Sequence, residues 1–145
     1  MNELEASLGL SQMKKLISFN KKRNTLAKRY ISVFKKLSIK YQYIKKNNYS
    51  SYHLFVIIFP NTKKVIKNYD KIFREFYKNK IAVMLHYIPV HLQPFYKLKG
   101  FKKGDFPISE NYASRSFSIP NFPGLKKSQQ EKVISVITTI YRKYL

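Results

Sequence analysis

The apolar run at residues 52–59, which reads YHLFVIIF, limits the fold more than any other segment. It is rich in β-branched and aromatic residues, and Pro60 and Asn61 close it, so it predicts a buried strand. Only one further run, residues 81–85, predicts a strand. Because two strands are too few for a doubly wound sheet, we expect a small α/β (α+β) fold. Its helices would pack on one face of a short sheet.

Helical periodicity accounts for the start of the chain. Asn2 and Glu5 have capping-box spacing, with Asn in place of Ser or Thr, so a helix can begin at once. Residues 1–38 predict two successive helical stretches, with Gly9 as a weak point and a basic outer face. A polar, irregular connection at residues 39–51 leads into the apolar strand.

Three further helices are expected after that strand. An amphipathic pattern covers residues 65–79, and a short helix is plausible at 110–117. Ser128 and Glu131 form a capping box that predicts the start of the last helix. Its expected buried face consists of apolar and aromatic residues at helical spacing: Ile134, Ile137, Tyr141 and Tyr144.

The chain carries a formal net charge of +22, from 29 basic and 7 acidic residues. One interpretation is binding to nucleic acid or an anionic membrane. The other is compositional drift in an AT-rich genome, since 24 of the basic residues are lysine and Asn, Ile, Tyr and Phe are also abundant. Nucleic-acid binders more often use arginine, whose planar fork reads phosphates and bases. We favour drift and do not expect specific nucleic-acid binding.

Composition also excludes several classes. There is no cysteine, which rules out disulfides and thiolate metal sites. No apolar run approaches the roughly 20 residues needed to span a bilayer, and the first residues do not form a targeting signal. A cytoplasmic location is expected. Neither a glycine-rich phosphate loop nor G-x-S-x-G nor H-E-x-x-H is present.

Candidate binding residues concentrate in residues 86–96, HYIPVHLQPFY, directly after the second predicted strand. His86 and His91 have no nearby carboxylate in sequence, so we expect no metal site. Imidazole, phenol and amide groups suit hydrogen bonding to the hydroxyls and phosphates of a ligand. Simple packing and capping of the loop is an equally good interpretation. His53 is interpreted as a half-buried structural histidine, and Arg115 could pair with Glu110 or bind an anion.

Three segments together resemble one family. They are MNELEASLGLSQMKKL at the start, SYHLFVI about fifty residues later, and HYIPVHLQPFYKLKGFKKGDFPISENYASRSFSIPNFPGL. Their order and spacing resemble the DegT/DnrJ-type sugar aminotransferases. There the corresponding patterns read approximately M-x-x-x-x-A-A-L-G-L-x-Q-L, H-L-F-V-I and H-Y-x-P-x-H-L-Q-P-x-Y, followed by S-L-P-x-F-P-G-L. The H-Y-I-P-x-H-L-Q form most resembles the branch that aminates keto-sugar nucleotides for pseudaminic-acid-type surface sugars.

The resemblance implies a fold-type I transaminase that depends on pyridoxal phosphate and is usually a homodimer. An amino donor, typically glutamate, would supply the amino group for a keto-sugar nucleotide. Residues 1–145 would be the C-terminal domain, with interdomain helices at 1–38 and a small α/β domain at 52–145. By the same resemblance, His86, Tyr87 and His91 would face the substrate. Gln93 and Tyr96 are weaker candidates.

The family's S-x-H-x-x-K lysine segment is absent from these residues. We therefore expect no catalytic residue in this chain, no binding of pyridoxal phosphate by the chain alone, and no activity without a further part. The leading interpretation is a C-terminal fragment of a sugar-nucleotide aminotransferase in surface polysaccharide or glycan biosynthesis. The alternatives are a docking module that completes a separately encoded N-terminal half, and a basic nucleic-acid-binding protein.

Overall fold

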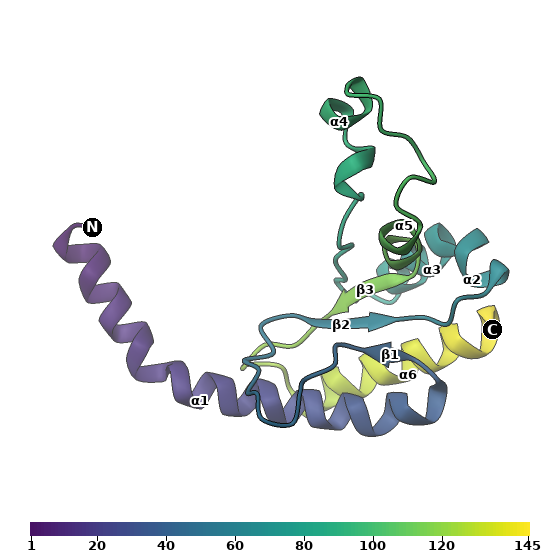
Figure 1. Cartoon of the computed structure of the whole chain (residues 1–145). Coiled ribbons are helices and arrows are strands. Elements are labelled where there is room, and N and C mark those ends of the chain that lie inside the picture. The colour runs from purple at the N-terminus through teal and green to yellow at the C-terminus, as the bar shows by residue number, and fades with distance from the viewer.

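The computed structural model describes residues 1–145 as a long N-terminal helix followed by a small sheet with further helices around it (Figure 1). The elements in chain order are α1 Glu3–Phe34, the 3-10 helix η1 Lys35–Leu37, β1 Lys40–Tyr41, β2 Phe55–Ile58, α2 Lys63–Lys67, α3 Tyr69–Lys78, the 3-10 helix η2 Val90–Leu92, α4 Pro94–Leu98, α5 Pro107–Ala113, β3 Ser116–Ile119 and α6 Lys127–Tyr144. The expected α+β class is confirmed.

The sheet has three antiparallel strands in the order β1-β2-β3. The predicted strand at 52–59 is confirmed as the central strand, although it is shorter and begins at Phe55. The predicted strand at 81–85 is wrong, because only Met84 pairs, through a single bridge to Ser118. Besides β1, strand β2 pairs with β3. In this pairing Phe55 of β2 lies opposite Ile119 and Ile58 lies opposite Ser116.

Strand β3 lies where the sequence favoured the end of a helix. The helix predicted at 110–117 is instead α5, which begins at Pro107 and ends at Ala113. The segment SFSI that follows is fully buried, serines included. Polar and apolar residues alternate in this segment, as in a strand, but four residues are too few to outweigh the helix expected at 110–117. Only pairing with β2 makes this segment a strand.

Helix α1 starts as predicted. The Oδ1 atom of Asn2 accepts a hydrogen bond from the N–H of Glu5 at 2.9 Å, and the Glu5 carboxylate accepts from the N–H of Asn2 at 3.0 Å. The expected division into two stretches is wrong, since one helix of 32 residues runs through Gly9. A single interior glycine costs only about 1 kcal/mol relative to alanine, which is too little to end a long helix.

The helix predicted at 65–79 divides at Asn68 into α2 and α3. The last helix, α6, begins at Lys127, where the side chain of Gln129 accepts a hydrogen bond from the N–H of Lys126 at 2.9 Å. The predicted cap at Ser128 is therefore wrong. On the buried face of α6, Ile137 and Tyr144 are buried as expected. Ile134 and Tyr141 are only half-buried, and the remaining buried residues are Gln130, Val133 and Ile140.

Helices α1 and α6 are joined by specific contacts as well as by the core. The side chain of Gln130 donates to the carbonyl oxygen of Leu26 at 2.8 Å, and Arg29 forms an ion pair with Glu131 at 2.7 Å. The hydroxyl of Tyr30 donates to the carbonyl oxygen of Pro120, and burial raises the pKa of this phenol. The C-terminal third of α1 is thereby fixed to the sheet side of the molecule.

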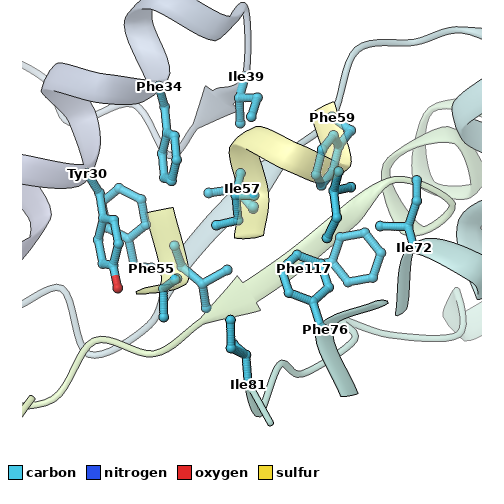
Figure 2. Close-up of a cluster of buried hydrophobic side chains, with 14 of the residues drawn as sticks. Tyr30, Phe34, Ile39, Phe55, Ile57, Phe59, Ile72, Phe76, Ile81 and Phe117 are labelled. Atoms are coloured by element: carbon cyan, nitrogen blue, oxygen red, sulfur yellow. The ribbon is translucent and has the colours of Figure 1, made fainter. Parts of the chain in front are cut away.

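The core combines aromatic rings with aliphatic side chains (Figure 2). Phe117 of β3 lies at its centre, with ring centroids 5.9 Å from Phe59, 5.5 Å from Phe76 and 4.7 Å from Tyr69. At the other end of the sheet the ring of Tyr30 lies 5.2 Å from that of Phe55. One continuous cluster thus joins α1, the sheet, α3 and α6.

Candidate functional site

Residues 85–105, which we call the arm, leave the body of the domain after Met84 and return to it at α5. They contain η2 and α4 and stand away from the sheet (Figure 1). All five candidate binding residues lie on the arm. His91 is its only buried residue, with 7% of its surface exposed. The arm therefore presents most of its side chains to solvent or to a partner.

His91 is held by the body of the domain. Its Nε2 atom lies 2.9 Å from Oε1 of Glu110 in α5, and its ring centroid lies 4.8 Å from that of Phe106. An ionised carboxylate only accepts hydrogen bonds, so Nε2 must carry the proton in this contact. This leaves Nδ1 as the imidazole nitrogen that makes no hydrogen bond within the chain.

The carboxylate of Glu110 has a second partner in the arm. Its Oε1 atom also accepts a hydrogen bond from the N–H of Gly104 at 2.7 Å. The Gly104 N–H, followed by His91, holds the pKa of Glu110 below its usual value, because both donors favour the ionised form. The expectation that no carboxylate lies near these histidines is wrong in space, since Glu110 comes from a neighbouring helix.

His86 and Tyr87 line a cavity of about 340 Å³ between the arm, α3 and α5. The Nε2 atom of His86 is buried and has no hydrogen-bond partner within the chain, and the same is true of the side-chain oxygens of Ser116 and Asn121. The polar groups on the walls also include those of Tyr69, Lys103, Glu110 and Ser114. Imidazole, phenol, ammonium and carboxylate groups thus gather on one cavity, which makes it a binding candidate.

Tyr96 and His91 line a second hollow of about 280 Å³ on the arm. The ring of Tyr96 lies 6.2 Å from that of Phe101, which shares this hollow. Gln93 belongs to neither cavity and its amide donates weakly to the carbonyl oxygen of Ile88, at 3.4 Å. All five candidates therefore lie on the arm. His86 and Tyr87 line the first cavity, His91 and Tyr96 line the second hollow, and Gln93 makes a hydrogen bond within the arm.

Sequence reasoning missed several side chains of the first cavity, among them Lys103, Glu110 and Tyr69. The Tyr69 hydroxyl donates to the carbonyl oxygen of Ser116, and burial raises its pKa to about 12. The three residues come from the arm, α5 and α3 respectively. No local pattern connects them, because only the packing of α3 and α5 against β3 brings them together.

Two further expectations concern His53 and Arg115. His53 is exposed, so its interpretation as a half-buried structural residue is wrong. Arg115 does not pair with Glu110. Its guanidinium donates to Oδ1 of Asn111 at 2.7 Å and to the carbonyl oxygen of Phe59 at 2.8 Å, which ties α5 to the end of β2.

The comparison with known proteins identifies the chain's relatives. Residues 1–138 match the model of the DegT/DnrJ/EryC1/StrS aminotransferase family. The chain belongs to this family. It is 35% identical over 142 residues to the uncharacterized protein MJ1066 of Methanocaldococcus jannaschii, and 29% identical over 144 residues to the spore coat polysaccharide biosynthesis protein SpsC of Bacillus subtilis. These matches cover 97% and 98% of the chain.

The fold agrees with solved members of the DegT/DnrJ/EryC1/StrS family. The structure of the putative sugar aminotransferase Spr1654 from Streptococcus pneumoniae, in its apo form, matches 99% of the chain with a TM-score of 0.90 and 26% identity. The same protein has been solved in forms with pyridoxal phosphate and with pyridoxamine phosphate. The chain spans only 36% of Spr1654 and of MJ1066, and 37% of SpsC.

The residues that line the first cavity do not by themselves suit pyridoxal phosphate. That cofactor needs a lysine in a pocket and a polar partner for its ring nitrogen. Lys103 is the one lysine on the first cavity, but it is exposed, and the Glu110 carboxylate already accepts two hydrogen bonds.

None of the helices in this chain is both long and apolar enough to cross a membrane.

Proposed function

We propose that these 145 residues are the C-terminal part of an aminotransferase that transfers an amino group to a keto-sugar nucleotide in the synthesis of surface polysaccharides or glycans. The observation that carries the proposal is the match of nearly the whole chain, at a TM-score of 0.90, to part of the putative sugar aminotransferase Spr1654. Pyridoxal phosphate and its lysine would be supplied by a part with a different sequence, and the amino donor would bind there too.

The proposed contribution of this chain is substrate binding by the arm. His86 and Tyr87 would reach hydroxyl or phosphate oxygens of the sugar nucleotide from the first cavity, whose walls they line. His91 would act through its remaining nitrogen, Nδ1, with Tyr96 beside it on the second hollow and Gln93 holding the arm. The HYIPVHLQ form favours a substrate of the pseudaminic-acid type.

A docking role for α1 is supported by a separate observation. The buried residues of α1 all lie at its C-terminal end, while its first half projects from the domain (Figure 1). Leu8 and Ile17 are 63% and 83% exposed. They are nine residues apart and so lie on roughly opposite sides of the helix, at about 100° per residue. A helix that is apolar on several sides is normally surrounded by protein.

We therefore propose that the first half of α1 is an interdomain element. It would dock onto the part that carries the lysine, whether that part is continuous with this chain or separately encoded. A homodimer of the complete enzyme is compatible with this arrangement.

The test is to express the chain together with the lysine-bearing N-terminal part of a full-length relative. A stable complex should form, and it should aminate a keto-sugar nucleotide when pyridoxal phosphate and glutamate are present. A panel of keto-sugar nucleotides would then define the preferred substrate. A stable, cofactor-loaded complex without any amino transfer would contradict the proposed function.

Matched variants locate the substrate contacts within that complex. His86→Ala and Tyr87→Phe should lower kcat/KM about ten- to a hundredfold each, the value of roughly 1.5–3 kcal/mol for a hydrogen bond to a charged group. The controls are His53→Ala and Tyr77→Phe, which alter an exposed histidine and an exposed tyrosine away from the arm. Equal activity of the arm variants and their controls would show that the arm does not touch the substrate.

A further inference from the structure

The arm has very few attachments to the domain that carries it. Beyond the backbone bridge between Met84 and Ser118 at its base, two hydrogen bonds connect residues 85–105 to the rest of the chain. Every other hydrogen bond of the arm is made between its own residues, such as that from the N–H of Lys102 to Oδ2 of Asp105. The polar attachment of the arm therefore depends on a small number of contacts, to which the ring of Phe106 adds packing against His91 and Phe101.

Both of those hydrogen bonds end on the same atom, Oε1 of Glu110. One comes from His91 on the outgoing side of the arm, at 2.9 Å, and the other from Gly104 on the returning side, at 2.7 Å. Glu110 thus connects the two sides of the arm to each other and to α5. An ionised acceptor strengthens both bonds, and the side chain of Glu110 is only 15% exposed, so water competes weakly for it.

The surroundings of these bonds favour a specific anchor over a chance contact. His91, the single buried residue of the arm, lies between Glu110 and the ring of Phe106. Gly104 has a φ of +100°, a backbone conformation in which any residue other than glycine would be strained. The chain therefore uses a glycine at the point where its N–H must face the carboxylate.

We propose that Glu110 is a positioning residue that fixes the arm, through His91 and Gly104, in the geometry that places His86 and Tyr87 on the first cavity. Glu110 also lines this cavity, so the anchor and the candidate ligand groups share one wall. The anchoring role stands on the contacts of this chain alone. Its consequence for substrate rests on the proposed function.

Hydrogen exchange of the chain by itself tests the anchor. In Glu110→Ala the Gly104 amide should exchange at least about tenfold faster, and trypsin should cleave after Lys97, Lys99 and Lys102 correspondingly faster. The matched control is Glu131→Ala, which removes another paired carboxylate, on α6. It should leave both the exchange of Gly104 and the cleavage of the arm unchanged.

Two observations separate positioning from general support of the fold. Glu110→Gln keeps an oxygen acceptor in the same place and should restore most of the Gly104 protection. In the ¹⁵N spectrum of His91, the proton should reside on Nε2 in the unaltered chain and in Glu110→Gln, and should divide between both nitrogens in Glu110→Ala. Unchanged exchange and an unchanged His91 spectrum in Glu110→Ala would overturn the proposal.

If Glu110→Ala does not fold, Gly104→Ala provides the second variant, because it strains the returning side and leaves the carboxylate intact. It should also expose the arm to trypsin, and the absence of that effect would count against the anchor. In the reconstituted complex, release of the arm should raise KM for the keto-sugar nucleotide more than it lowers kcat. A released arm with an unchanged KM would sustain the anchor and refute the proposed substrate role.

Discussion

Replacing Phe117 with alanine is the most direct test of the architecture, because Phe117 belongs to the strand that the sequence did not reveal. Its side chain is fully buried and contacts three aromatic rings, those of Phe59, Tyr69 and Phe76. Truncation of a buried phenylalanine to alanine costs about 3–5 kcal/mol through lost transfer energy and the cavity left behind. A domain of this size has a total stability of about 5–15 kcal/mol, so this change should remove at least about a fifth of it.

Chemical and thermal unfolding followed by circular dichroism would measure the effect. We expect Phe117→Ala to lower the melting temperature by about 10 °C, from the usual 2–4 °C per kcal/mol for domains near this size. Phe117→Leu refills most of the space and should cost clearly less, about 1–2 kcal/mol. Ile108→Ala is the control, since Ile108 is 87% exposed and its truncation should change stability by less than about 0.5 kcal/mol.

The reasoning would be refuted by a loss of less than about 1 kcal/mol in Phe117→Ala. A residue with little burial at the end of a helix would give such a small loss. The same small loss would show that the pairing of β2 with β3 does not bury Phe117 in the core.

Three further predictions concern acid stability, charge and cofactor binding. Three carboxylates have a pKa below the usual value of 4.5, because hydrogen bonds stabilise their ionised form. They are Glu75, Glu110 and Glu131, and their main donors are Lys143, Gly104 and Arg29 respectively. The stability that these carboxylates contribute is therefore present above pH 4.5 and is lost as the pH falls through the lowered pKa values. Melting temperatures should therefore fall below about pH 4.5, and a melting temperature that stays level down to about pH 3 would contradict the assigned contacts. If the charge of +22 reflects compositional drift, binding to duplex DNA should be weak, independent of the DNA sequence and lost at moderate salt, as measured by fluorescence anisotropy. Tight, sequence-selective binding at physiological salt would favour the nucleic-acid interpretation. Spectroscopic titration of the 145-residue chain with pyridoxal phosphate should show no saturable one-to-one binding, and a stoichiometric absorbance band abolished by changing a single lysine would overturn the assignment of the cofactor to another part.

Local physical chemistry determined much of this fold from the sequence. The cap formed by Asn2 and Glu5 starts α1, and the run that contains β2 reads as a strand because its β-branched and aromatic residues suit a pleated, buried surface. Periodicity located α6 and two of its buried residues, Ile137 and Tyr144. The resemblance to a family rested on motifs along the whole chain, and the family match over residues 1–138 confirmed it.

Tertiary structure decided the elements whose partners are distant in sequence. The segment SFSI alternates polar and apolar residues, but it is too short to identify a strand by itself. It is a strand because β2 offers it backbone partners and a core for Phe117. Residues 81–85 have the composition of a strand, but only Met84 finds a partner there. Backbone hydrogen bonds between strands depend on where the neighbouring chain lies, so composition alone could not separate these two segments.

The candidate site shows the same division. The sequence placed the five candidate binding residues on one loop after an apolar run, because prolines and polar side chains predict a loop from the local sequence alone. The anchor at Glu110 required the fold, since its carboxylate meets His91 and Gly104 only when α5 packs beside the arm. The sequence specifies the chemistry of each side chain. Whether a carboxylate pairs with a particular imidazole depends on the distance between them, which only the folded chain determines.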